Sequence, residues 1–349
     1  MAHWNIPPGQ TARVRIIDAG SSISSIPTGR LMAPVLDGFS HMPQMPSLSF
    51  LVESDNGRTA LFDLGIAKDW KNFAPIISNR LKTNGYEIDV NRDVPDLLQQ
   101  HNVDLASVHS VVWSHWHWDH IGDLSKFPPV TELVVGPGFS EAFLPAYPEN
   151  QESPIRVSDV RGRHVNEIDF TRNSIQIGHF RAVDFFRDGS FYLLDTPGHA
   201  IGHLGGLART TLNPDTFIFM GGDLCHHASE LRPSKYIPLP DTIEYPIISA
   251  SLYPCPGAVI EQLQRPRGRG ALDPMFDPAR GVPLEDAVET VQKTQELDAD
   301  ENVLFIYAHD KAVTEIGDLF PLTANNWKKD GWRQRMFWAF LRDFKDLIK

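Results

Sequence analysis

The run Ser-His-Trp-His-Trp-Asp-His at residues 114–120 constrains this chain more than any other stretch. Three imidazoles and one carboxylate fall within six residues, directly after the apolar run 108–113, which predicts a short buried strand. Because alternate side chains of a strand share a face, we expect His115, His117 and Asp119 to point the same way. Imidazole and carboxylate are ligands that zinc accepts, so the run predicts a metal site at a strand end.

A plainer alternative is a solvated histidine-rich loop, or histidines packed among Trp113, Trp116 and Trp118. Four potential ligands in one HxHxDH run favour the metal site over this alternative. The turn after the strand can redirect Asp119 and His120, so the cluster could serve two ions.

The run resembles the HxHxDH motif of the metallo-β-lactamase superfamily, and further pieces follow in that family's order. Each remaining candidate ligand comes just after an apolar, strand-like run: His199 after 191–194, Asp223 after 216–220, and His309 after 303–307. Upstream, Asp63 lies in a Phe-Asp-Leu-Gly stretch that is similar to the family's early Asp-x-Gly, a position that supports the ligands. The resemblance covers roughly residues 13 to 310.

This resemblance implies a fold and a ligand set. The fold is a four-layer αββα sandwich, and the metal is zinc, with two ions per chain. One ion would take the residues His115, His117 and His199, and the other Asp119, His120 and His309. Asp223 would bridge the two ions.

Hydrophobic patterns along the chain fit such an architecture. Strands are predicted near 13–18, 48–53, 59–63, 131–135, 181–186, 191–194, 204–209, 216–220 and 303–307. Helices are predicted over 71–84, 94–101, 284–297 and 327–348. An Asp-Asn-Gly turn at 55–57 predicts a hairpin between the second and third strands. Strand-rich halves with helices between and after them favour two sheets covered by helices.

We expect a single domain over residues 1–349, with two segments outside the common core. Residues 27–46 form a long apolar loop rich in proline and glycine, and residues 231–283 form a proline-rich insertion. Long loops are often functional, so both are expected to wall a substrate pocket, although the first could equally pack on the core or a dimer partner. The arginines of the insertion could meet an anionic group, but they are expected to lie in solvent: Arg265, Arg267 and Arg269.

The net charge of −12, with 44 acidic and 32 basic residues, disfavours nucleic acid and anionic membranes as partners. The first residues show no apolar core of a signal peptide, and no run of about 18 apolar residues predicts a membrane span. A cytoplasmic protein with a small-molecule substrate is therefore expected, and a homodimer stays open. Cys225 is expected to be a small buried side chain, although zinc ligation by its thiolate is an alternative.

The predicted chemistry is hydrolysis. Two zinc ions sharing a hydroxide would supply a nucleophile, because metal binding lowers the pKa of water to about 7. Asp119 would orient that hydroxide and pass its proton to the leaving group. We expect the substrate to be a small cyclic ester or cyclic amide that enters between the segments 27–46 and 231–283. An acyl-thioester hydrolase of secondary metabolism and a mononuclear iron sulfur dioxygenase remain alternatives.

Homoserine-lactone-degrading members of the family often carry a tyrosine three residues after the bridging aspartate, as the resemblance implies. In this chain the position is His226, whose ring N–H could donate a hydrogen bond to an oxyanion. An ordinary exposed loop histidine is an equally open interpretation. An aromatic pocket wall is also expected, from Trp4, Phe39, Trp116, Trp118 and the tyrosines of the insertion, Tyr236, Tyr245 and Tyr253.

Overall fold

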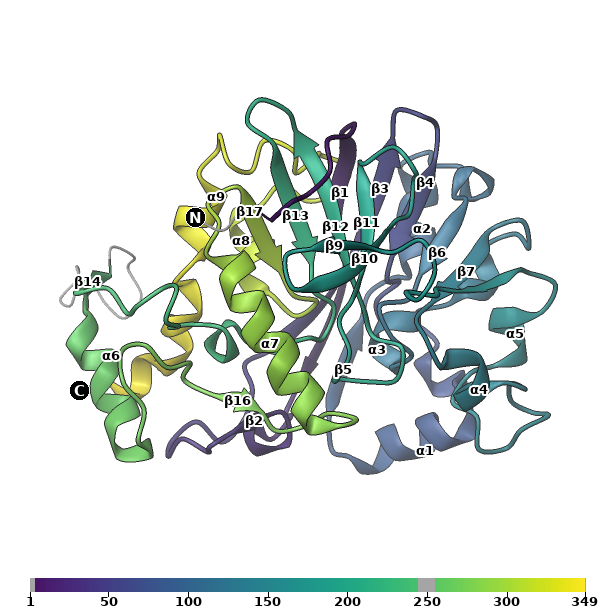
Figure 1. The fold of residues 1–349 in the computed structure, drawn as a ribbon. Coiled ribbons are helices and arrows are strands. Elements are labelled where there is room, and N and C mark those ends of the chain that lie inside the picture. The colour runs from purple at the N-terminus through teal and green to yellow at the C-terminus, as the bar shows by residue number, and fades with distance from the viewer. Residues whose placement is uncertain (1–3, 244–254, 349) are drawn as a thin grey trace.

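Two β-sheets form the centre of the computed structural model, which describes residues 4–243 and 255–348 (Figure 1). The first sheet has the strand order β5-β1-β3-β4-β6-β7-β8, and the second has the order β17-β13-β12-β11-β10-β9. Two further pairs of short strands, β2 with β16 and β14 with β15, lie outside the sheets.

The strands of the first sheet are β1 (Ala12–Ser24), β3 (Met45–Ser54), β4 (Thr59–Phe62), β5 (Glu87–Val90), β6 (Ser110–Val112), β7 (Glu132–Val135) and β8 (Val165–Glu167). Those of the second are β9 (Ile175–Ile177), β10 (Phe180–Asp184), β11 (Phe191–Asp195), β12 (Leu204–Thr211), β13 (Thr216–Met220) and β17 (Val303–Ile306). The short pairs are β2 (Met32–Ala33) with β16 (Asp277–Pro278), and β14 (Thr242–Ile243) with β15 (Cys255–Pro256).

Helices lie outside and between these strands. The α-helices are α1 (Pro75–Thr83), α2 (Val94–Gln100), α3 (Trp118–Ile121), α4 (Phe139–Phe143), α5 (Val157–Val160), α6 (Gly257–Gln264), α7 (Leu284–Asp298), α8 (Lys311–Ile316) and α9 (Trp332–Met336). The 3₁₀ helices are η1 (Thr28–Arg30), η2 (Trp70–Asn72), η3 (Leu105–Ser107), η4 (Leu124–Lys126), η5 (Ala228–Glu230), η7 (Arg265–Arg267) and η8 (Ala339–Leu347).

Side chains alternate between the two faces of each sheet and so divide the hydrophobic core into layers. In β3, Phe50 packs in the cluster that joins the two sheets, whereas its neighbour Leu51 packs in the cluster under α1 and α2. Because successive side chains point to opposite faces, the first sheet is covered on both sides. The second sheet is likewise covered, since Phe219 of β13 packs in one cluster with Val291 of α7. The predicted αββα sandwich is confirmed.

The predicted hairpin is present. Strands β3 and β4 pair antiparallel, and the Ser54 amide donates to the Arg58 carbonyl at 2.9 Å. Gly57 has φ +87°, a left-handed conformation that glycine adopts without steric cost.

The expectation that His115, His117 and Asp119 share one strand face was wrong. Strand β6 ends at Val112, and the two histidines lie in the bend between β6 and helix α3, which contains the aspartate. The reason is local: the Ser114 amide donates to the Asp63 carboxylate at 2.7 Å rather than to a neighbouring strand, so the ladder stops.

The predicted continuous helix over 327–348 is also wrong. Helix α9 ends at Met336, and the 3₁₀ helix η8 begins at Ala339. The apolar residues before the break pack between the sheets, whereas Phe340 and Phe344 pack in the cluster on the far side of the second sheet. One straight helix cannot serve both cores, so the chain bends between them.

The two segments outside the core pack against each other. In the first, residue Ala33 of β2 pairs with Asp277 of β16. Phe39 is buried, with its ring centroid 4.7 Å from that of Phe344 and 6.1 Å from that of Phe276. The single-domain organisation stays a prediction, and Tyr245 and Tyr253 lie outside the described residues.

The expectation of three solvated arginines was wrong for two of them. The Arg267 guanidinium lies 4.7 Å from the Phe276 ring centroid and donates to the Met275 carbonyl at 2.8 Å. Arg269 pairs with Asp277. Most of their hydrogen-bonding partners are backbone and carboxylate groups of the insertion, and Arg267 also donates to the Pro34 carbonyl at 3.2 Å. The two arginines therefore hold the insertion together and join it to the segment 27–46.

No helix in the described ranges is long and apolar enough to cross a membrane.

Candidate metal centre

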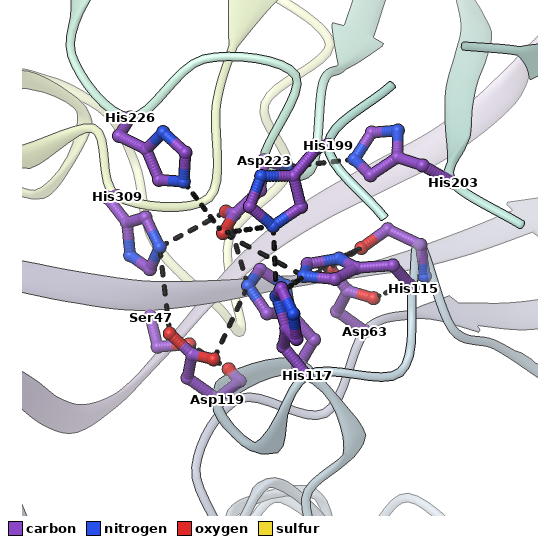
Figure 2. A network of polar contacts seen from close by, with 12 residues as sticks. Ser47, Asp63, His115, His117, Asp119, His199, His203, Asp223, His226 and His309 are labelled. Carbon is purple, nitrogen blue, oxygen red and sulfur yellow. Dashed lines mark hydrogen bonds and ion pairs between the residues drawn. The ribbon is translucent and has the colours of Figure 1, made fainter. Parts of the chain in front are cut away.

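Strand direction brings the candidate ligands together at one edge of the sandwich. Strands β4 and β6 run parallel, as do β13 and β17, and the loops that leave their carboxyl ends carry the HxHxDH run, Asp223 and His309. His199 follows β11. All seven residues predicted as ligands converge in two groups that share Asp223 (Figure 2).

The first group consists of three imidazoles and one carboxylate oxygen. Nδ1 of His117 lies 2.8 Å from Nε2 of His115 and 2.9 Å from Nε2 of His199. The Oδ2 atom of Asp223 lies 3.8 Å from Nε2 of His115 and 3.5 Å from Nε2 of His199. Three ring nitrogens therefore face one point.

The second group uses the other oxygen of the same aspartate. The Oδ1 atom of Asp223 lies 3.2 Å from Nε2 of His120 and 3.1 Å from Nε2 of His309. Asp119 completes the group, with carboxylate oxygens 4.0 Å from Nε2 of His120 and 3.8 Å from Nε2 of His309. Asp223 thus lies between the two groups, one oxygen toward each.

Hydrogen bonds turn the rings of the second group inward. Nδ1 of His120 lies 2.9 Å from Oδ2 of Asp63, and Nδ1 of His309 donates to the Pro46 carbonyl at 2.7 Å. In both rings Nε2 is left to face the centre. Asp63 itself accepts from the amide and hydroxyl of Ser114, at 2.7 and 2.8 Å. Such partners orient ligand imidazoles in metal sites.

The charge states in the first group match the needs of a cation. Burial and neighbouring histidines hold the pKa values of His115 and His199 well below the ordinary value, so both rings are neutral, as ligation requires. Against its burial, His120 and His309 hold the pKa of Asp223 well below its usual range, so this carboxylate is ionised.

Buried polar atoms without hydrogen bonds show whether these residues fit a metal ion. Nε2 of His120 and Oδ1 of Asp223 are buried, and although they lie 3.2 Å apart, neither makes a hydrogen bond of acceptable geometry to any described residue. Buried polar atoms without partners are rare, because each costs about 1–3 kcal/mol. Convergent nitrogens and oxygens of this kind suit a divalent ion such as zinc, so the donor set fits.

Comparison with known proteins agrees with this geometry. The family model for the metallo-β-lactamase superfamily matches residues 42–207. Gamma-lactamase FDB1 of Fusarium pseudograminearum is 39% identical over 98% of this chain and 85% of its own. The chain belongs to the metallo-β-lactamase superfamily. Metallo-hydrolase mfmC of Annulohypoxylon moriforme is 43% identical, over 96% of this chain and 88% of its own.

A solved structure shares the superfamily fold at low identity. It is the structure of Bacillus thuringiensis AiiA with N-decanoyl-L-homoserine bound at its active site. That chain is 15% identical and aligns over 90% of this chain and 99% of its own, with a TM-score of 0.58. This likeness supports the fold alone.

Sequence reasoning missed His203, which supports Asp223, the aspartate that the two ligand groups share. Its Nε2 accepts a hydrogen bond from the Asp223 amide at 3.1 Å, and its Nδ1 donates to the Thr196 carbonyl at 3.0 Å. Burial lowers its pKa to about 4, which keeps the neutral ring that this arrangement needs. The four-residue spacing after His199 was the signal that could have found it.

His226 lies at the superfamily metal site rather than on the surface. Its side chain is buried, and its Nε2 is 3.5 Å from Oδ2 of Asp223. Its ring centroid is 4.8 Å from that of His199. Burial alone would lower its pKa, but the carboxylates of Asp223 and Glu230, 3.5 and 3.8 Å from its ring nitrogens, raise it to about 9. The interpretation as an exposed loop histidine was wrong, whereas its catalytic role stays a prediction.

Cys225 is buried, and it is in neither of the two ligand groups. Burial raises the pKa of this thiol well above its usual range, which disfavours the thiolate that zinc would bind.

A pocket reaches the candidate metal ligands, and only part of its wall was predicted. Trp116 and Trp118 line it as expected. Trp4 does not, because its ring packs against Gly178 and His179, and Phe39 packs in the core described above. The wall that sequence reasoning missed comes from α1 and the chain after it, with Ile77, Arg80, Leu81, Asn84 and Tyr86.

Proposed function

We propose that this protein is a dinuclear zinc hydrolase that opens a small cyclic ester or cyclic amide, as lactonases and γ-lactamases do. One observation carries the two-metal part of the proposal. The two oxygens of Asp223 face two different sets of ligands, at 3.1 to 3.8 Å. A carboxylate placed in this way suits a bridge between two ions.

The chemical part of the proposal rests on the residues around this bridge. Zinc at the two groups would supply Lewis acidity and would activate water at neutral pH. Asp119 lines the pocket with its carboxylate and would take a proton from the attacking water and return it to the leaving group. His226 lines the same pocket and would donate its Nε2–H to the carbonyl oxygen as negative charge develops there.

The substrate part rests on the relatives. Gamma-lactamase FDB1 and a second related protein, gamma-lactamase MBL2, are named for cyclic amides, and the latter is 42% identical to this chain over 67% of it. The pocket wall combines the indole rings of Trp116 and Trp118 with apolar side chains, which suits a small ring. Metal-dependent hydrolysis of a lactone or lactam bond is therefore the activity that these observations support best.

Metal analysis and a substrate panel test the proposal together. Purified protein is expected to carry about two zinc ions per chain, in line with its two ligand groups. Hydrolysis followed by pH-stat is expected for γ- and δ-lactones, acyl-homoserine lactones, benzoxazolinones or β-lactams. Turnover of acyl thioesters alone would replace the cyclic substrate by the thioesterase alternative. Retained activity in Asp223→Ala would overturn the bridged two-metal site.

We also propose a cytoplasmic location and a small-molecule substrate. Cell fractionation tests the location. Light scattering on the purified protein measures whether it is a monomer or a homodimer.

A further inference from the structure

Three arginines from distant parts of the chain line the pocket that leads to the metal-ligating residues. Arg30 comes from η1, Arg80 from α1, and Arg280 from the end of the proline-rich insertion. The same pocket is lined by Asp119 and His226. A chain with a net charge of −12 thus presents three cationic side chains at the mouth of its candidate active site.

These arginines have no carboxylate partner among the described residues. Arg30 lies 5.5 Å above the ring of Tyr86, and Arg280 has its Nη2 3.4 Å from Nε2 of His117. Elsewhere in the described chain, arginines with ion pairs are common, and Arg156 with Asp159 is an example at 2.8 Å. What sets Arg30, Arg80 and Arg280 apart is that three guanidinium groups without an ion pair to any described residue line one pocket.

The contact with His117 cannot be a hydrogen bond for Arg280 once the first ligand group holds a metal ion. Nδ1 of His117 is the atom that faces the first ligand group. With that nitrogen bound to a metal, Nε2 carries the ring hydrogen and cannot accept from Arg280. The guanidinium is then free to bind something in the pocket.

The three charges act on one another. Arg80 and Arg30 line the same pocket as Arg280, and their charges act on it. The charges of the same three arginines also act on Tyr86, which lines this pocket too. The carboxylates of Asp119 and Asp223 also act on Arg280, but both belong to the ligand groups and would be engaged by bound metal. The three like charges would then repel one another, so an anion between them would be stabilised.

We infer that the substrate is a cyclic ester or amide that bears a carboxylate, and that Arg30, Arg80 and Arg280 bind this group while the ring carbonyl faces the metal-ligating residues. This inference rests on the proposed function and narrows its substrate class. Guanidinium groups match a carboxylate through paired N–H donors. The arginines act as specificity-determining residues, since they hold a part of the substrate that does not react.

Matched substrates test the inference. We would compare γ-butyrolactone-γ-carboxylate with γ-valerolactone, in which a methyl group replaces the carboxylate, and pyroglutamate with its neutral amide. In the wild-type protein, kcat/KM is expected to be about tenfold or more higher for the charged member, the contribution of one charge-assisted hydrogen bond. Added salt should reduce this preference, because it screens exposed charges.

Arg80→Gln is the sharpest variant, since Arg80 is exposed on α1 and far in sequence from every ligand. It is expected to raise KM about tenfold more for the charged substrate than for the neutral one. Arg30→Gln should behave in the same way. Arg265→Gln is the matched control, because it removes the same charge from an exposed side chain that does not line this pocket.

The outcomes separate the inference from the proposed function. Equal kcat/KM for both members of each pair, or equal loss on both in Arg80→Gln, would overturn the carboxylate inference while the hydrolase stands. Turnover of no lactone or lactam would overturn the proposed function. In that case, calorimetric titration with the ring-opened product of the charged lactone decides about the arginines. Binding that weakens about tenfold in Arg80→Gln supports the carboxylate site, and equal binding overturns it.

Discussion

The backbone amide of Asp223 donates a hydrogen bond of 3.1 Å to Nε2 of His203, a histidine that is not in either ligand group. Nδ1 of the same ring is anchored by Thr196, 3.0 Å from its carbonyl oxygen and 2.9 Å from its hydroxyl. The ring thus ties the loop after β13 to the loop after β11, from which His199 extends. His203 therefore aligns two candidate ligands, Asp223 and His199, although it is in neither ligand group itself.

The first prediction concerns this alignment. His203→Asn keeps a donor near Thr196 but loses the acceptor for the Asp223 amide, whereas His203→Gln can place an oxygen near the position of Nε2. We expect His203→Asn to weaken zinc binding by about 10–100-fold, as loss of a supporting partner does, and His203→Gln to weaken it less. Competition with a chromogenic chelator measures the affinities. Equal affinities in the two variants would contradict this role.

The second prediction is a pH dependence of stability. The folded protein holds the pKa of His203 at about 4, below the ordinary value of 6.5. The unfolded chain therefore binds a proton between pH 6.5 and 4 that the folded chain does not, so the contribution is full above pH 6.5 and is lost as pH falls toward 4. The free energy of unfolding should fall by about 3 kcal/mol more over this window in the wild type than in His203→Gln.

Denaturant titrations of the chelator-treated proteins measure this difference. Comparing two proteins that differ at one residue cancels the titration of the other histidines. An identical slope in both would mean that His203 is not held neutral.

Much of the metal centre could be predicted because each ligand follows a strand-like run. A strand that ends in a polar residue is a local pattern, and parallel neighbours bring such ends to one edge. His203 carries no such pattern, since it precedes β12 and its partners are backbone groups. Only its spacing from His199 is visible in the sequence.

The pocket wall was harder to predict because composition does not reveal which side of an element a residue faces. Trp4 and Phe39 are as aromatic as Trp116, yet both are used in packing. Arg80 lies on a helix that the hydrophobic pattern predicts, but its approach to Arg280 depends on tertiary structure over a separation of 200 residues. Composition likewise does not show that the apolar residues of the C-terminal segment pack in two separate hydrophobic clusters, which is why one continuous helix was predicted there.

The third prediction tests how tightly the HxHxDH loop is seated. Gly122 follows α3 with φ +50°, and an added Cβ would lie 2.5 Å from Cβ of Leu64. Its amide donates to the Gly65 carbonyl at 3.0 Å, next to Asp63. We expect Gly122→Ala to destabilise the fold by about 2–4 kcal/mol, from left-handed strain together with overpacking. It should also weaken zinc binding at the second group.

Gly57→Ala is the matched control for this substitution. Gly57 also has a positive φ, +87°, but nothing lies within 4 Å of its added Cβ. It should therefore show the strain alone, about 1–2 kcal/mol, with zinc binding unchanged. Denaturation curves and metal titrations measure both effects. Equal destabilisation by the two variants would show that the Leu64 contact is relieved at no cost.

The final prediction concerns His226, which we expect to assist the reaction without binding a metal. Its Nε2 is 3.5 Å from Asp223, and its amide donates to Glu230 at 2.9 Å, so the ring is held at the edge of the site. The two ligand groups are complete without it, and an extra imidazole would close the open position that a catalytic zinc needs. His226→Phe keeps a flat ring but removes the donor, whereas His226→Gln keeps an N–H.

We therefore expect His226→Phe to lower kcat by less than the factor of about 10²–10³ that loss of one oxyanion donor costs in a protease, because zinc at the site would carry most of the developing charge. His226→Gln should recover part of the rate, and both variants should retain two zinc ions. Steady-state kinetics on a lactone or lactam substrate and metal analysis of the same preparations measure these effects. A metal lost in His226→Phe would make His226 a ligand. An unchanged kcat would leave it a packing residue, since an oxyanion donor must affect the transition state more than the ground state.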